Sequence, residues 1–181
     1  MSFRILKRLP GGMTLSEATQ EDIDYVESHF REGERRGQML ADAEGRRTLL
    51  AEHDQCWTVR AENGDILGYL GVLTMPDNSY MSNLRGISYM SCENVDRHAF
   101  SFVKGTLEGF RWMVEQMPPW VDTFRSWPPA SFERSVAWQK RMLGMREIGR
   151  VPVKDDFLVL LETTRREIEA FRKRKERSCH S

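Results

Sequence analysis

The sequence predicts an α+β fold, in which a central sheet is flanked by helices and followed by an extra basic helix at the carboxyl end. Three observations lead to this prediction. A chain of 181 residues, of which 40% are hydrophobic and 30% charged, is long enough to bury the core of one compact domain. Residues 131–151 have the pattern of a helix, a glycine stop and a strand. Residues 56–75 have the pattern of a β-hairpin, and strand and helix patterns follow one another along the rest of the chain.

The first predicted elements are a short strand over residues 13–17 and the helix that follows it. Thr19 and Asp22 have the spacing of a capping pair, in which each side chain accepts a hydrogen bond from the backbone of the other residue. The helix is predicted to continue to about Glu34. Its inner face is expected to carry Ile23, Val26 and Phe30.

A second helix is predicted over residues 38–53, and a hairpin follows it. The apolar residues of that helix are Met39, Leu40, Ala43 and Leu50. The strands of the hairpin are expected at residues 56–60 and 66–75, on either side of Glu62-Asn63-Gly64-Asp65. The Asn-Gly pair supplies the positive backbone angles that a tight hairpin requires.

The middle of the chain predicts a strand, a long helix and another strand. The first strand is expected over residues 85–92, and the helix over residues 96–117. Pro118 and Pro119 end this helix, because proline cannot continue the hydrogen-bond ladder. The next strand is expected over residues 121–127 and is closed by two further prolines. The apolar residues at helical spacing are Ala99, Val103, Leu107, Phe110, Val114 and Met117.

The segment at residues 131–151 is the clearest local pattern. Ser131 is expected to cap its helix by accepting a bond from a backbone amide. Gly144 is expected to end the helix in the left-handed conformation, with Met145 folding back onto the last apolar turn. A strand follows, and a final strand is expected at residues 157–161.

The charge of the chain is uneven, although its net charge is zero. Residues 163–181 carry seven basic and three acidic residues, so this tail has a net charge of +4 and the rest of the chain −4. The run Arg172-Lys173-Arg174-Lys175 is compatible with a nucleic acid or an acidic protein as partner. A solvated terminal helix is the alternative, because the tail has only Ile168 and Phe171 as apolar anchors. The predicted division is therefore an extension (1–12), a domain (13–162) and a basic helical tail (163–181).

Several classes of protein are excluded by what the sequence lacks. No apolar run approaches the roughly 20 residues of a membrane span, and the first residues do not resemble a secretion signal. Cys56, Cys92 and Cys179 are an odd number without close spacing, which favours reduced thiols in a cytoplasmic protein. The four histidines have no metal-ligand spacing, so no metal site is expected.

The order of these elements resembles the GCN5-related N-acetyltransferase (GNAT) superfamily over roughly residues 13–162. Residues 13–24 resemble the opening strand and first helix of that family, and Lys140 to Met145 resembles the Leu-Gly-Phe ending of its fourth helix. Within the family, the layout of residues 120–144 is most similar to divergent acetyltransferase-like proteins of tailed bacteriophages. The resemblance implies a mixed, mostly antiparallel sheet and the transfer of an acetyl group from acetyl-CoA to an amine. It also leaves open a catalytically inactive protein with a structural role in the virion or in contacts with the host.

The resemblance implies a binding site for the cofactor pyrophosphate between the strand at 85–92 and the long helix. The family has a glycine-rich turn there, whereas this chain has Cys92-Glu93-Asn94-Val95-Asp96-Arg97-His98-Ala99, in which Ala99 alone fits the pattern. In one reading, Arg97, His98 and Lys104 supply charge in place of backbone amides, and Asn94 or Ser91 adds a hydrogen bond. In the other reading, Asp96 only caps the helix.

The resemblance also directs attention to candidate catalytic residues. Lys140 stands where many members of the family have a tyrosine that protonates the leaving thiolate, and a surface lysine is the alternative. Tyr89 and Ser91 lie on one face of their strand and are expected either to line the cleft or to be ordinary sheet residues. Cys92 stands at the end of that strand and is either an activated thiol or a small buried one. The segment with Arg125, Trp127, Pro128 and Pro129 is expected at the cleft wall or at a docking surface.

Overall fold

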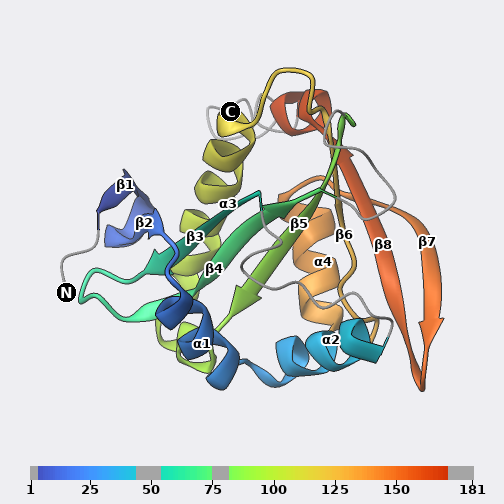
Figure 1. The fold of residues 1–181 in the computed structure, drawn as a ribbon, viewed down its shortest axis with the longest axis horizontal. Coiled ribbons are helices and arrows are strands. Elements are labelled where there is room, and N and C mark those ends of the chain that lie inside the picture. The colour runs from blue at the N-terminus through green and yellow to red at the C-terminus, as the bar shows by residue number, and fades with distance from the viewer. Residues whose placement is uncertain (1–3, 44–53, 75–81, 171–181) are drawn as a thin grey trace, which may run out of the picture.

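The computed structural model describes residues 4–43, 54–74 and 82–170. In them the chain forms an eight-stranded sheet with the order β1-β2-β3-β4-β5-β6-β8-β7 (Figure 1). Strands β5 and β6 pair in parallel, and the other neighbours pair antiparallel. The expected mixed, mostly antiparallel sheet is thus confirmed. The strands are β1 (Ile5–Arg8), β2 (Thr14–Glu17), β3 (Gln55–Arg60), β4 (Ile66–Leu73), β5 (Leu84–Ser91), β6 (Thr123–Ser126), β7 (Arg146–Val153) and β8 (Asp156–Thr164).

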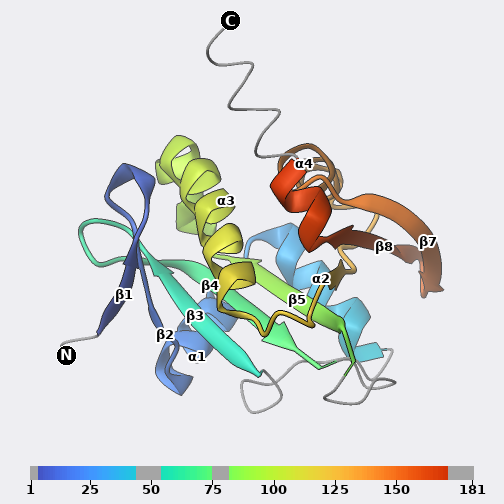
Figure 2. The same ribbon diagram turned by 90° about the horizontal axis from the view of Figure 1, so that it is seen from above.

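Helices cover both faces of the sheet (Figure 2). The α-helices are α1 (Gln20–Ser28), α2 (Glu32–Ala43), α3 (Ala99–Gln116) and α4 (Glu133–Met142), and the short 3₁₀ helices are η1 (Pro10–Gly12) and η3 (Glu93–His98). Successive side chains of β3 show the two layers, because strand residues alternate between faces. Trp57 packs edge-on against Trp112 of α3, with ring centroids 5.4 Å apart. Its neighbour Cys56 packs with Ile23 and Val26 of α1 in a second, smaller core cluster.

Three local predictions are confirmed. Thr19 and Asp22 form a reciprocal capping box at the start of α1. The hairpin between β3 and β4 turns at Gly64, whose φ is +91°. The helix, stop and strand near residue 144 are also present, since α4 ends before Gly144, whose φ is +67°, and Met145 is buried in the core.

Ser131 does not cap α4, contrary to the prediction. The N-cap residue is Phe132, and no side chain caps this helix end. The Ser131 hydroxyl instead donates a hydrogen bond to Asp156, at the start of β8. The contact of Ser131 is with a residue 25 positions away, so the local pattern could not reveal it.

The predicted helix over residues 19–34 is wrong in its length, because the chain forms two helices there. Phe30 makes an antiparallel β-bridge with Cys92, at the end of β5, and this pairing separates α1 from α2. The start of the long helix is also corrected. It begins at Ala99 after η3, and Asp96 makes an ion pair with Arg31 at 3.0 Å and is not the helix cap.

Strand β1 was not predicted, and it extends the sheet by antiparallel pairing with β2. The turn η1 between these strands lies against α3, where a Cβ atom added to Gly11 would come within 2.5 Å of Ser101. Close packing of the two backbones therefore requires glycine at this position. The first turns of α3 are covered by this contact.

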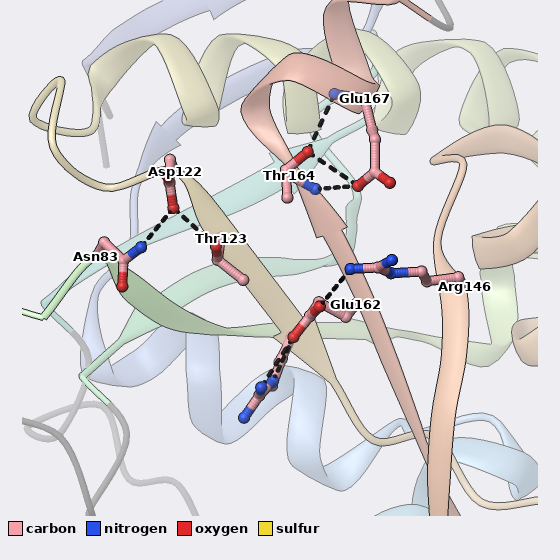
Figure 3. Close-up of polar contacts among 8 residues, drawn as sticks. Asn83, Asp122, Thr123, Arg146, Glu162, Thr164 and Glu167 are labelled. Carbon is pink, nitrogen blue, oxygen red and sulfur yellow. Dashed lines mark hydrogen bonds and ion pairs between the residues drawn. The ribbon is translucent and has the colours of Figure 1, made fainter.

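At the β7 end of the sheet, side chains connect the three neighbouring strands β6, β8 and β7 (Figure 3). Glu162 of β8 accepts hydrogen bonds from Arg125 of β6 at 2.9 Å and from Arg146 of β7 at 3.0 Å. Burial opposes the ionisation of Glu162, but these two guanidinium groups outweigh it, and the pKa of Glu162 is lowered. Strands β6, β7 and β8 are therefore linked through one carboxylate.

Residues 165–170 are helical after β8, and Arg165 joins them to α3. Its guanidinium donates hydrogen bonds to four backbone oxygens around the end of that helix, those of Val114, Met117, Pro118 and Val121. The oxygens of Val114 and Pro118 also accept from the backbone amides of Met117 and Val121, and the guanidinium adds a donor to each of the four. The described residues do not include the second half of the helix predicted over 38–53, most of the stretch between the strands predicted at 66–75 and 85–92, Cys179 or the basic run 172–175.

Candidate functional site

The candidate site lies where the parallel strands β5 and β6 separate. Their ladder has three register pairs, which join Leu84, Arg85 and Gly86 to residues 123–125. From Ile87 onward β5 pairs with β4 alone, and Figure 1 shows that the two strands diverge along their length. The gap widens toward Ser91 on one side and toward Ser126 on the other.

The gap contains a pocket, which we call the inter-strand pocket. It encloses about 860 Å³ of space, including its open mouth. Residues from α2, both strands, α3 and α4 contribute to it, so it reaches from one helical layer to the other. Its lining consists of Glu34, Gly37, Leu70, Ile87, Ser88, Tyr89, Met90, Thr106, Phe110, Met113, Ser126, Trp127, Pro128, Pro129, Ser135, Trp138, Gln139 and Leu143.

Glu34 is the charged residue that α2 places in the inter-strand pocket. Its side chain is buried, with 7% of the residue exposed, and Oε1 accepts a hydrogen bond from the Ser91 hydroxyl at 2.8 Å. Burial raises the pKa of Glu34 to about 7, although the bond from Ser91 and the charge of Arg31 lower it in part. A carboxyl group with this pKa exchanges a proton readily near neutral pH.

Glu34 was not predicted as a site residue, because the sequence pattern marks it only as the end of a helix. A local signal existed in Gly33 and Gly37, which flank it at the spacing of one helical face. A Cβ atom added to Gly33 would come within 2.4 Å of the Phe132 ring, and one added to Gly37 within 3.3 Å of Pro129. The two glycines allow α2 to lie close to the segment between β6 and α4, and this contact buries Glu34.

Tyr89 faces the same pocket from β5. Its ring stacks on Trp138 of α4 at 5.5 Å and also contacts Phe102 of α3 at 5.8 Å. The hydroxyl group is buried and makes no hydrogen bond of normal geometry with the described residues, although the Thr106 hydroxyl lies close enough to lower the pKa of Tyr89 in part. Burial, together with the charge of Glu34, raises the pKa of Tyr89 well above its usual value. The phenol therefore stays protonated and can donate a hydrogen bond to a ligand.

Opposite Tyr89, the wall of the pocket carries a polar cluster from β6 and α4. Gln139 is buried, its carbonyl oxygen accepts from the Ser126 hydroxyl, and its amide donates to Ser135 at 3.2 Å. The neighbouring Lys140 does not line this pocket. Its ammonium group pairs with Glu147 of β7, where the bonds from Arg150 and then from Lys140 lower the pKa of Glu147 to about 2.

The predicted catalytic and cofactor residues thus divide into groups. Tyr89 lines the inter-strand pocket, and Ser91 binds the carboxylate of Glu34. Lys140 lies in an ion pair at the surface. The remaining five, which are Cys92, Asn94, Arg97, His98 and Ala99, belong to the segment between β5 and α3.

In that segment, Cys92 is fully buried in the α1 cluster, and burial raises the pKa of its thiol to about 12. The prediction of a small buried thiol is confirmed. The Asn94 amide donates to the carbonyl of Ile66 at 3.1 Å. His98 lines a separate hollow beside Gly11 and Glu62, and Arg97 and Ala99 are exposed.

Three backbone amides of this segment, those of Cys92, Glu93 and Val95, donate to carbonyl oxygens of the protein. The amide of Cys92 donates to Leu67 O and that of Glu93 to His29 O, both at 2.9 Å. The amide of Val95 donates to Cys92 O at 3.2 Å. The link between α1 and α2 therefore occupies, by β-bridging, the edge that a glycine-rich turn would leave open.

Beside the inter-strand pocket, on a neighbouring face of α2, lies a second hollow that we call the entrance groove. It is bounded by the starts of α2 and α4 and by η3, and its lining consists of Arg31, Glu32, Gly33, Arg36, Glu93, Asp96, Ser131, Phe132, Glu133 and Arg134. Two of its cations are already paired. Arg31 binds Asp96, and Arg36 binds Asp155 at 2.9 Å and Asp156 at 3.2 Å.

Within residues 4–43, 54–74 and 82–170, no cluster of three histidine, cysteine, aspartate or glutamate side chains is capable of holding a metal ion. None of the helices in these ranges is long and apolar enough to cross a membrane.

No protein-family model matches the chain, and no curated protein sequence is a detectable relative. Solved structures do match it. An aminoglycoside acetyltransferase, AAC(6')-Ib, in complex with coenzyme A and kanamycin has a TM-score of 0.60 and 17% identity, and the match covers 88% of this chain and 99% of that one. A GCN5-related N-acetyltransferase from Kribbella flavida has a TM-score of 0.59 and 16% identity, covering 84% and 98% of the two chains. A chimeric spermidine N-acetyltransferase from Vibrio cholerae has a TM-score of 0.58 and 7% identity, covering 87% and 99%. The chain therefore has the GNAT fold, and identities this low establish the fold alone.

Coenzyme A consists of a pantetheine arm with a thiol and a nucleotide with a diphosphate, and the two ends fit this chain differently. The inter-strand pocket is a mainly apolar slot beside the free edge of β5, and the buried Tyr89 hydroxyl in it lacks a partner. These features fit a thioester and its arm. The segment after β5 offers the diphosphate few free amides and presents the carboxylates of Glu93 and Asp96, so it does not fit that end.

Proposed function

We propose that this protein transfers an acyl group, in the simplest case acetyl, from a thioester of the coenzyme A type to an amine. The observation that carries the proposal is Glu34, a buried carboxyl group with a pKa of about 7 in the pocket between the parallel strands. An amine is protonated at neutral pH and is not nucleophilic until it loses a proton. A carboxylate with this pKa is suited to accept that proton.

In this proposal, Glu34 is the general base. Ser91 holds its carboxylate through the hydroxyl group at 2.8 Å and through its backbone amide, and the ammonium group of the acceptor is proposed to approach the same carboxylate from the pocket. The low dielectric of the pocket strengthens the attraction between the ionised carboxylate and this cation. Contact between Gly37 and Pro129 excludes water from this side of Glu34.

Tyr89 is proposed to donate a hydrogen bond to the thioester. The thioester supplies the acetyl group: a carbon–nitrogen bond to the amine forms, the carbon–sulfur bond breaks, and the leaving thiolate takes up the proton that the nitrogen loses as the amide forms. Negative charge develops on the carbonyl oxygen and then on the sulfur during this exchange, and a preorganised donor stabilises it. Stacking on Trp138 fixes the direction of the Tyr89 hydroxyl before the ligand arrives.

The test is a thiol-release assay with acetyl-CoA and a panel of primary amines that includes a polyamine, an aminoglycoside and a lysine peptide. We expect release that depends on the amine and that falls at least 100-fold in the Glu34→Gln variant, the usual contribution of a general base. Glu115→Gln, an exposed glutamate of α3, is the matched control and keeps the wild-type rate. A Glu34→Gln protein with the wild-type rate would exclude Glu34 as the base.

A non-catalytic protein of phage type, with a structural or host-interaction role, is the alternative proposal. It is favoured by the engaged amides after β5, which differ from an open anion site. Thermal unfolding distinguishes the two proposals, because a ligand at one hundred times its dissociation constant stabilises the native state by about 2.7 kcal/mol. Unfolding that is insensitive to millimolar thioester, together with no thiol release, would support the non-catalytic role.

A further inference from the structure

We propose that the donor site recognises the acyl-pantetheine thioester and gains no affinity from the nucleotide diphosphate of coenzyme A. This inference rests on the proposed function and specifies its donor. It follows from three features of the segment between β5 and α3 and of the entrance groove.

The first feature is the direction in which a donor must leave the inter-strand pocket. Strands β5 and β6 are joined at Leu84–Gly86 and open toward Ser91, so an arm lying in the gap points toward Cys92 and Glu93. It must pass over the link between α1 and α2 there, because this link bridges the edge of β5 at Cys92. The entrance groove begins there, since Glu93 and Asp96 line it. A nucleotide attached to the arm would therefore lie in or over this groove.

The second feature is the lack of available backbone donors at that exit. An anion site built from a strand-to-helix turn uses free amides and an open helix end. Here the amides of Cys92, Glu93 and Val95 already donate to carbonyl oxygens of the protein. The 3₁₀ helix η3 precedes α3, and the Pro10–Gly12 turn lies against the first turn of α3 at Ser101. This turn covers one side of the start of α3, at Ser101, while Ala99 and Phe100 on the other side are exposed.

The third feature is the charge of the entrance groove. Arg31 and Arg36 are neutralised by Asp96, Asp155 and Asp156. Among the remaining charges of the lining, the single cation Arg134 is outnumbered by three carboxylates, those of Glu32, Glu93 and Glu133. A diphosphate brought to this surface experiences net repulsion, which salt screens over about 10 Å at 0.1 M.

The pocket itself suits the uncharged arm. Its lining is mainly apolar, and β5 from Ile87 to Met90 has one edge without a registered strand, whose peptide groups can pair with the amides of the arm. At Ser91 this edge is already used, because the carbonyl oxygen of Ser91 accepts from the amide of Arg31 at 3.2 Å. The same arm occurs on coenzyme A, on free pantetheine and on carrier proteins. The shared chemistry is an acyl thioester at the end of a pantetheine chain.

The test compares acetyl-CoA with acetyl-pantetheine by calorimetric titration of the full chain, so that binding is read independently of turnover. We expect dissociation constants within about threefold of each other, and tighter binding of acetyl-CoA, but not of acetyl-pantetheine, as salt rises from about 0.05 to 0.5 M. Acetyl-CoA that binds 30-fold more tightly than acetyl-pantetheine, or that loses affinity with salt, overturns the inference while the proposed function stands. If neither thioester binds, both fall.

A charge variant sharpens the comparison. Glu93→Gln removes one carboxylate from the groove without altering the amide of this residue, and it is expected to tighten acetyl-CoA binding two- to fivefold and to leave acetyl-pantetheine unchanged. Glu115→Gln, remote on α3, is the control for a change in net charge. Equal effects of Glu93→Gln on both donors would contradict the reasoning. An acetylated carrier protein tested as a donor then identifies the source of the arm, and turnover with it or with acetyl-pantetheine alone supports the inference.

Discussion

Replacing Glu34 with glutamine is predicted to make the protein more stable at alkaline pH and equally stable at acid pH. The pKa of Glu34 is raised from 4.5 to about 7 in the folded state. A raised carboxyl pKa means that the folded protein binds this proton more tightly than the unfolded chain. The associated stability is fully present below the unfolded pKa and is lost as pH rises through the folded pKa. One pKa unit corresponds to about 1.4 kcal/mol, so the ionised group costs about 3 kcal/mol above pH 7.

Glutamine resembles the protonated carboxyl group in shape and can still accept the bond from Ser91. The free energy of unfolding of Glu34→Gln should therefore equal that of the wild type near pH 4 and exceed it by about 3 kcal/mol at pH 8. Urea denaturation of both proteins between pH 4 and 8 measures this difference, in which the titrations of the other groups cancel. Glu115→Gln, exposed on α3, should show no such pH dependence. A difference that is constant with pH would refute the raised pKa, and with it the argument that Glu34 is ready to accept a proton near neutral pH.

Three further predictions concern neighbouring residues. Tyr89→Phe should lower kcat by 10- to 100-fold. The free energy of unfolding, measured in urea, should stay equal or rise by about 1 kcal/mol, because a buried hydroxyl without a partner is removed. A loss of stability would mean that the hydroxyl has a structural partner. Ser91→Ala removes a hydrogen bond that lowers the pKa of Glu34. The rise of kcat/KM with pH should therefore move to higher pH, and the rate at pH 7 should fall several-fold. An unchanged pH profile would show that Ser91 does not tune the proton affinity of Glu34. Arg165→Met removes the guanidinium from four backbone oxygens around the end of α3 and should lower the free energy of unfolding by about 2–4 kcal/mol, mainly through Met117 and Val121, because the oxygens of Val114 and Pro118 keep a backbone amide. No change in urea denaturation would show that water replaces the guanidinium.

The sequence was sufficient for those elements whose cause is local. Gly64 and Gly144 both have the positive φ that their turns need, and the capping box of Thr19 depends on a residue three positions away. The elements that were wrong depend on distant partners. The break between α1 and α2 arises from a bridge between Phe30 and Cys92, and β1 exists because β2 offers it an edge. Helical periodicity carries no information about either contact.

The same distinction explains which part of the site could be predicted. Tyr89 was found because strand alternation and the family resemblance both place it at the cleft. Glu34 has the same chemistry in the sequence as the exposed Glu32 two residues earlier, and it differs only in what surrounds it. Its partner Ser91 is 57 positions away, and its burial depends on the fit of Gly33 against Phe132, almost 100 positions away. Proton affinity is thus set by tertiary packing. A glycine pair beside a glutamate on one helical turn is the sequence signal that such packing leaves, and in this chain it marks the residue on which the proposed activity depends.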